Sequence, residues 1–175
     1  MYKNILKSCM ILFIILFITG CGSSKINSKN ISPNINTKNS FPYNINILTN
    51  GGKEKNVLGI QEVSNKNLLE AVSSTIKETK LFLDVKEDSD LILDLFIVRV
   101  GQPVAGKSMT VNVEIAWVLK NKNEIIWKES IITSDTKRPA DFTSAYNRVV
   151  EATIDATKKN IKEGLLKLSN LSIKL

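Results

Sequence analysis

Residues 109–119 alternate apolar and polar side chains more regularly than any other part of the chain. A period of two places successive side chains on opposite faces of a β-strand, so this stretch predicts a strand with one buried and one wet face. A short polar turn at residues 121–123 then leads into residues 124–132, which predict a second strand of the same hairpin. We expect its buried face to carry Met109, Val111, Val113, Ile115, Trp117, Leu119, Ile125, Trp127 and Ile131, and its wet face Thr110, Asn112, Glu114, Lys128 and Ser130.

Three further segments have strand patterns. Residues 43–48 alternate apolar side chains with asparagines and end before an Asn-Gly-Gly turn, which predicts a half-buried strand. Residues 81–85 and 91–100 are also rich in apolar side chains. The run at residues 91–98 is almost continuously apolar, which is typical of a central strand.

Two helices are predicted between and after these strands. Ser64 is placed to cap the first, with Val63 and Leu68 as a hydrophobic staple, and its apolar stripe is Leu68, Leu69, Val72 and Ile76. Asp141 is placed to cap a long closing helix. Small residues in its apolar stripe allow a close approach to a sheet, and that stripe is Phe142, Ala145, Tyr146, Val149, Ala152, Ala156, Leu165 and Leu168.

The order strand, helix, short strand, three longer strands, helix predicts an α+β fold. We expect a two-layer sandwich in which a mostly antiparallel sheet of four to five strands carries both helices on one face. We expect residues 41–175 to form this single domain.

Residues 1–20 have a different pattern, which is typical of a secretory signal peptide. Lys3 and Lys7 precede an apolar run at residues 9–18, and small residues follow it. A helix of ten residues is roughly 15 Å long, about half of a hydrocarbon core near 30 Å. We therefore expect a cleaved leader; the alternative is a membrane span that is retained.

Ile18, Thr19, Gly20 and Cys21 resemble the lipobox of bacterial lipoproteins, in which an aliphatic and two small residues precede a cysteine. The resemblance covers the first 21 residues. It implies a diacylglyceryl thioether on the Cys21 sulfur, cleavage before Cys21 by the lipoprotein signal peptidase, and acylation of the new amino terminus by a chain such as palmitate. Two or three acyl chains, at about 0.8 kcal/mol per buried CH₂, anchor a protein durably. Because Gly22 stands where an aspartate would resemble an inner-membrane retention signal, the resemblance favours an outer-membrane lipoprotein facing the periplasm.

Residues 21–40 contain serine, asparagine and lysine without apolar periodicity or any acidic residue. Such composition predicts a disordered tether behind the lipidated amino terminus. Leader and tether hold five of the 24 basic residues and none of the 17 acidic ones, so the net charge of +7 falls to +2 over residues 41–175. A nucleic-acid partner is not expected, because such a protein concentrates basic residues on its folded surface. The exposed candidates for such a role, Lys158 and Lys159, are interpreted as a solvated helix face.

The chain contains no histidine, which excludes Ser-His-Asp and Cys-His nucleophiles and histidine-ligated zinc. Its two cysteines, Cys9 and Cys21, lie within the first 21 residues, so no disulfide framework spans the domain. From the sequence we expect no catalytic, metal-binding or cofactor-binding residues, and Cys21 is the one modification site.

Residues 101–108 match the Walker A pattern G-x-x-x-x-G-K-[ST], ending in Gly106, Lys107 and Ser108. A phosphate-binding loop requires a helix that begins at the lysine, because helix and loop amides together bind the phosphates. Here a period-two segment follows, and an exported protein has no nucleotide pool to use. We interpret residues 101–108 as a hairpin loop without nucleotide.

Other candidate residues can be interpreted as functional or as structural, and for each of them the structural interpretation is favoured. Asp94 lies inside an apolar strand and could serve as a catalytic carboxylate, but no second carboxylate lies at a predictable distance, so an outward or edge-facing position is favoured. Arg99 is a candidate partner for Asp94. Trp117 and Trp127 are interpreted as core. An acidic cluster lacks the glycine and terminal glutamate of a calcium-binding EF-hand loop and predicts a solvated hairpin turn; its members are Asp84, Glu87, Asp88 and Asp90.

These features favour a non-catalytic, lipid-anchored module of the cell envelope that binds a protein partner. The order of elements is similar to that of small periplasmic assembly lipoproteins of the LptE type, which implies an assembly or transport auxiliary. An envelope hydrolase using Asp94 or the Gly106-Lys107-Ser108 loop is the alternative. A structural lipoprotein without a fixed partner is a third interpretation.

Overall fold

The alternating segments form an antiparallel hairpin of β4 (Met109–Asn121) and β5 (Glu124–Lys137) in a computed structural model that describes residues 24–122 and 124–173. The predicted inner residues of β4 are all buried, from Met109 to Leu119. Strand β3 (Leu91–Gly101) pairs antiparallel with β4 along almost its whole length. The central position of β3 confirms the interpretation of its apolar run.

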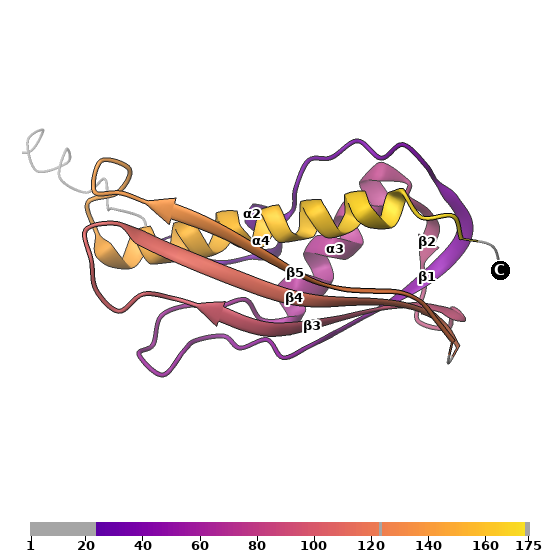
Figure 1. The fold of residues 1–175 in the computed structure, drawn as a ribbon, viewed down its shortest axis with the longest axis horizontal. Coiled ribbons are helices and arrows are strands. Elements are labelled where there is room, and N and C mark those ends of the chain that lie inside the picture. The colour runs from indigo at the N-terminus through magenta and orange to yellow at the C-terminus, as the bar shows by residue number, and fades with distance from the viewer. Residues whose placement is uncertain (1–23, 123, 174–175) are drawn as a thin grey trace, which may run out of the picture.

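Strands β1 (Phe41–Asn50) and β2 (Phe82–Val85) complete the sheet in the order β2-β1-β3-β4-β5. β1 runs parallel to β3 and to β2, but most of the paired residues belong to the two antiparallel ladders. The predicted α+β sandwich with a mostly antiparallel sheet is confirmed. In Figure 1, α4 runs along β4 and β5, whereas α3 lies toward β1 and β2.

Helix α3 (Asn65–Thr79) begins as predicted, because the Ser64 hydroxyl accepts a hydrogen bond from the backbone N–H of Asn67. Helix α4 (Ala145–Ser169) begins later than predicted. Ser144 caps it, while the Asp141 carboxylate accepts a hydrogen bond from the backbone N–H of Arg138 and closes the preceding turn. Asp141 therefore stabilises a turn of the loop and is not the helix cap.

Trp117 fixes the distance between α4 and the sheet. Its side chain is fully buried, and Gly164 of α4 lies directly over its ring. A Cβ at residue 164 would come within 2.3 Å of Trp117 Cζ2, so only glycine permits this approach. Asn160, one turn earlier, accepts a hydrogen bond from Trp117 Nε1 at 3.1 Å and donates to the Ile131 carbonyl at 2.7 Å.

The inner face of β5 is charged where α4 covers it. Lys137 forms ion pairs with Asp135 and Asp155, and Lys159 of α4 forms an ion pair with Asp135. Burial lowers the pKa of Lys137, but the hydrogen bonds that its ammonium group donates to Asp155 and Asp135 outweigh this effect, so the pKa lies above its usual value. Lys167 similarly pairs with Glu129. These pairs join the last strand to the helix.

The N-terminal segment corrects the expectation of a disordered tether. Residues 24–40 are part of the fold, and they include a short helix, α2 (Ser28–Ile31), with a capping box between Asn27 and Asn30. α2 contacts both α3 and α4. Ile26, Ile31 and Ile35 are buried in the core. Although the residues between them are mostly polar, these three side chains hold the segment against the helices.

No helix among the described residues is long and apolar enough to cross a membrane. Residues 1–20 and both cysteines, Cys9 and Cys21, lie outside the described residues. The signal peptide and the lipidation of Cys21 therefore stay predictions from the sequence.

Replacing Ile31 with alanine tests whether the N-terminal segment belongs to the folded core. Because the Ile31 side chain is fully buried, we expect Ile31→Ala to lower the free energy of unfolding by about 2–5 kcal/mol. Urea denaturation followed by circular dichroism measures this change. Asn36→Ala, at an exposed position of the same segment, is the control and is expected to leave stability unchanged. Equal stabilities of the two variants would mean that the segment does not pack.

Candidate functional site: the outer face of the sheet

The face of the sheet that points away from α3 and α4 is open over the part of the chain that the structure describes. Thr110, Asn112, Lys128 and Ser130 are exposed on it, as predicted. Two cross-strand hydrogen bonds order these side chains, one between Thr110 and Thr136 at 2.8 Å and one from the Ser130 hydroxyl to Glu114 at 2.9 Å. The polar rows of β4 and β5 thus form one side of an accessible surface.

Apolar side chains occupy the middle of this surface, which the sequence did not predict. Phe96 is 50% exposed and Ile132 is 60% exposed, although both are large and apolar. Half-buried Ala116 and Val118 lie on the strand between them. We call the set the outer apolar patch, and its members are Leu48, Phe96, Val98, Ala116, Val118 and Ile132.

Strand pairing makes the outer apolar patch continuous. Phe96 is directly opposite Ala116, and Asp94, two residues earlier on the same face of β3, is opposite Val118. Leu48 is paired with Asp94 from the other side, which places it diagonal to Phe96. Exposed apolar groups on one contiguous face, rimmed by polar ones, are typical of interaction surfaces.

The apolar run at residues 91–98 concealed this patch. An unbroken run predicts a strand buried on both faces, and β3 is central, but only one of its faces has a covering layer. Leu93, Leu95 and Ile97 face the helices, whereas Phe96 and Val98 face outward. The apolar residues at alternate positions of this run were visible in the sequence. Sequence alone does not show whether their face of the strand is covered by a second layer or exposed.

Asp94 lies on this outer face, as favoured from the sequence. Its carboxylate pairs with Lys120 of β4 at 3.4 Å, and both side chains are half-buried. Arg99, which the sequence offered as its partner, lies beyond a bulge in β3 and opposite Glu114 instead. Asp94 is thus a member of a surface ion pair beside the outer apolar patch.

The Walker-like loop connects two antiparallel strands, which confirms its interpretation as a hairpin loop. β4 begins at Met109, directly after Ser108, so the helix that a phosphate site needs is absent here. Lys107 is exposed, and Gly106 has a φ of +142°, which only glycine adopts readily. The glycine serves the turn.

The acidic cluster does not assemble into a site. Glu87, Asp88 and Asp90 are exposed, and Asp90 pairs with Lys122 at 3.6 Å. They lie on the connection from β2 to β3. These two strands each pair with β1 and not with one another, so the expected hairpin is wrong. The expected solvated turn is confirmed. Within the described residues, no group of three or more histidine, cysteine, aspartate or glutamate side chains is arranged to hold a metal ion.

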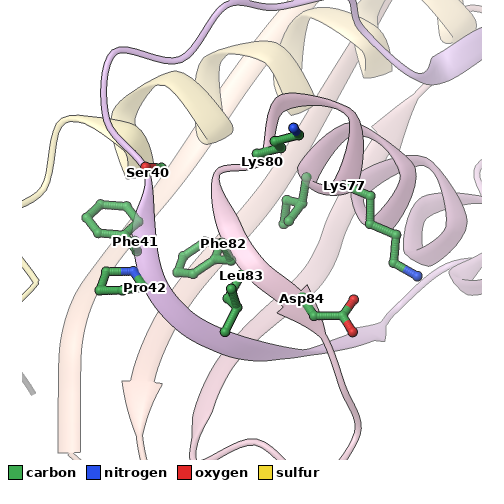
Figure 2. A pocket seen from close by; sticks show the side chains of 9 residues that line it. Ser40, Phe41, Pro42, Lys77, Lys80, Phe82, Leu83 and Asp84 are labelled. Atoms are coloured by element: carbon green, nitrogen blue, oxygen red, sulfur yellow. The ribbon is translucent and has the colours of Figure 1, made fainter.

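A hollow of about 570 Å³ lies at the β2 edge of the sheet, between β1, β2 and the end of α3 (Figure 2). Its floor includes Phe41 and Phe82, whose rings pack with centroids 5.2 Å apart. Lys77 and Lys80 border it, and the Asp84 carboxylate is turned back to the backbone N–H of Val85. The lining thus combines apolar side chains with the two lysines, the Asp84 carboxylate and the hydroxyl of Ser40.

The remaining candidates from the sequence belong to the packing. Trp117 is buried, and Trp127 is half-buried against the core, so both are structural as predicted. Lys159 pairs with Asp135 of β5 at 2.6 Å, which links it to the sheet, although its side chain stays about half exposed.

Comparison with known proteins identifies the fold. A solved Xanthomonas campestris protein of family DUF330 is similar, with a TM-score of 0.60 and 11% identity over 79% of this chain and 92% of that chain. A Chlamydia trachomatis protein has a TM-score of 0.56 and 7% identity, covering 74% of this chain and 96% of its own. A minor lipoprotein from Acinetobacter baumannii has a TM-score of 0.49 and 6% identity over 73% of this chain and 92% of that chain.

No protein-family model matches the chain, and no curated protein sequence matches it significantly. At the low identities of the solved structures, the likeness shows a shared fold alone.

Replacing Lys107 tests whether the Walker-like loop has any function in nucleotide binding. Because a strand follows the loop, we expect neither the wild-type protein nor Lys107→Ala to bind ATP in isothermal titration calorimetry. Both proteins should unfold at the same temperature, since Lys107 is exposed. Submicromolar ATP binding by the wild type that disappears in Lys107→Ala would restore the hydrolase alternative.

Proposed function

We propose that this chain is a non-catalytic lipoprotein of the cell envelope, anchored through acyl chains on Cys21, that binds a protein partner with the outer face of its sheet. The role is that of an assembly or transport auxiliary, and the location is the periplasmic face of the outer membrane. Support for the anchor comes from the lipobox-like residues 18–21 and the short apolar leader before them.

The outer apolar patch is the observation that carries the binding role. Leu48, Phe96, Val98 and Ile132 are exposed together on a face that no described part of the chain covers. Polar side chains of β4 and β5 border them, which is the arrangement of an interface with an apolar centre and a polar rim. A protein surface is the occupant that satisfies both, because it supplies apolar area for the centre and hydrogen-bonding groups for the rim.

Within residues 24–122 and 124–173, the groups that the enzyme alternative would use do not come together in one site. Asp94 is paired with Lys120 on the outer strand face, and Lys107 projects from an exposed loop at the far end of β3. General acid–base or phosphate chemistry needs several such groups directed at one position. The surface around Asp94 is instead suited to contact over an area.

Replacing Cys21 tests the anchor. Cys21→Ser removes the sulfur that the lipid would occupy, so we expect the protein to move from the membrane fraction to the soluble fraction. Sodium carbonate washing and flotation of cell membranes measure this distribution. Cys9→Ser is the matched control, because it changes the other cysteine of the leader region and should leave the protein on the membrane. A Cys21→Ser protein that still floats after the wash would indicate a retained membrane span.

Site-specific crosslinking in intact cells tests the partner. A photoreactive residue at Asn112 or Lys128, on the polar rim, should capture one dominant envelope protein. Phe96→Asp places a charge in the outer apolar patch and should abolish that product while the protein stays folded, since the Phe96 side chain is half exposed.

The same photoreactive residue at Lys162, on the exposed side of α4, is the control position. Crosslinks of equal yield from Lys162, or only lipid and scattered adducts from Asn112 and Lys128, would contradict a specific partner and favour the structural interpretation.

A further inference from the structure

The N-terminal segment enters the fold beside the connection between β1 and α3. The backbone N–H of Ile26 donates to the Gln61 side chain at 2.8 Å, and its carbonyl accepts from Asn67 of α3 at 3.1 Å. The Ile26 side chain is buried. The chain is therefore held in place from Ile26 onward at this end of the molecule.

Two loops are joined at this same end by glutamine and asparagine side chains. Gln102, at the start of the β3–β4 loop, donates to the Gln61 carbonyl at 2.7 Å and to Thr153 of α4 at 3.0 Å, and it accepts from Asn56 at 2.8 Å. We call residues 53–61 and 102–108 together the loop platform. Figure 1 shows both loops at the end of the molecule where α4 begins.

The loop platform presents apolar side chains to solvent. Val57 is completely exposed, Leu58 is 59% exposed and Val104 is 78% exposed. The Asn56 side chain accepts hydrogen bonds from the backbone N–H groups of Leu58 and Ile60, so the turn that presents Val57 and Leu58 is locally fixed. Val57 and Leu58 at the tip of this ordered turn do not pack against the fold. Their exposure places them where a surface outside the protein could bury them.

Lysines surround these apolar tips. Lys53, Lys55 and Lys107 of the loop platform and Lys25 beside it are exposed. Two acidic residues accompany them: Glu54 of the loop platform is exposed, and Glu62, directly after it, is half-buried. Apolar tips within an excess of lysines are the chemistry that suits the headgroup region of an anionic bilayer.

The length of chain before Ile26 restricts where a lipid anchor can be. Cys21 precedes Ile26 by five residues, which span at most about 18 Å when fully extended. An anchor on Cys21 therefore lies within this distance of the loop platform. A disordered segment reaching to residue 40 would have left the orientation of the domain free, but the packing of Ile26, Ile31 and Ile35 removes that freedom.

We propose that the loop platform is the membrane-facing surface of the protein and rests on the anionic bilayer into which Cys21 is anchored, with Val57, Leu58 and Val104 in the headgroup region. The proposal rests on the lipid anchor of the proposed function. It assigns the opposite end of the molecule, with the β2–β3 connection, to the aqueous side.

The test uses lipidated protein purified from cell membranes and placed in vesicles of phosphatidylcholine and phosphatidylglycerol. An environment-sensitive fluorophore is attached through Ala105→Cys, next to Val104, or through Asp88→Cys at the opposite end; both positions are exposed. We expect blue-shifted emission and quenching by nitroxide-labelled lipid at residue 105, several-fold stronger than at residue 88. Adding Val57→Asp and Leu58→Asp should reduce quenching at residue 105 toward the level at residue 88.

Equal quenching at residues 105 and 88 in anchored protein would overturn the proposal while leaving the anchor intact. A second anchor separates the two questions. Because the chain has no histidine, a histidine tag replacing residues 1–21 binds nickel-chelating lipid at one place only. Absence of acyl groups on Cys21 by mass spectrometry would contradict the proposed anchor, and the tagged protein would still report whether the loop platform meets the bilayer. Protein crosslinks at residue 105 without lipid quenching would assign this surface to a protein instead.

Discussion

The contact between Trp117 and Gly164 sets the geometry on which the rest of the structure depends. Because Gly164 of α4 has no side chain, the helix packs directly onto the large indole of Trp117 on β4, where any Cβ at residue 164 would clash. Asn160 satisfies the indole N–H and reaches across to the backbone of β5, so one buried polar group joins the helix to two strands. On both sides of this contact α4 covers β4 and β5. At the edge of the covered area, Lys137 of β5 forms ion pairs with Asp135 and with Asp155 of α4.

Concentrating the helices on one face leaves the molecule with two unlike surfaces. The inner face uses the whole apolar row of β4 and receives α3, α4 and, outside them, the packed N-terminal segment. The outer face receives nothing from the described chain, yet it retains Phe96, Val98 and Ile132. A soluble surface without a binding role has no need of such a group of side chains, because each exposes apolar area to water that a polar residue would not.

Sequence alone predicted the parts of the fold that depend on local patterns. The period of two in β4, the cap at Ser64 and the hairpin nature of residues 101–108 are all properties of neighbouring residues, and the structure confirms them. The failures have two kinds of cause. Asp141 and Ser144 are both good caps, and a local hydrogen bond from the backbone N–H of Arg138 engages Asp141, which leaves the cap position to Ser144. Isoleucines spaced among asparagines and serines at residues 26–35 carry no periodicity, so only the groove that receives them reveals that they are ordered. The outer apolar patch was hidden because exposure of a strand face depends on the number of layers.

The packing of the N-terminal segment also bears on how the protein would meet its partner. With Ile26 fixed on the fold, a domain lipidated at Cys21 has only five residues of slack, and it moves with its anchor. Encounters would then take place by lateral diffusion in the plane of one membrane, which is a two-dimensional search. The strands of the sheet run from the loop platform to the opposite end of the molecule. On the proposed bilayer contact they would stand upright on the membrane, and the outer face would point parallel to its plane. A partner embedded in the same leaflet would approach that face edge-on, already oriented by the membrane that both proteins share.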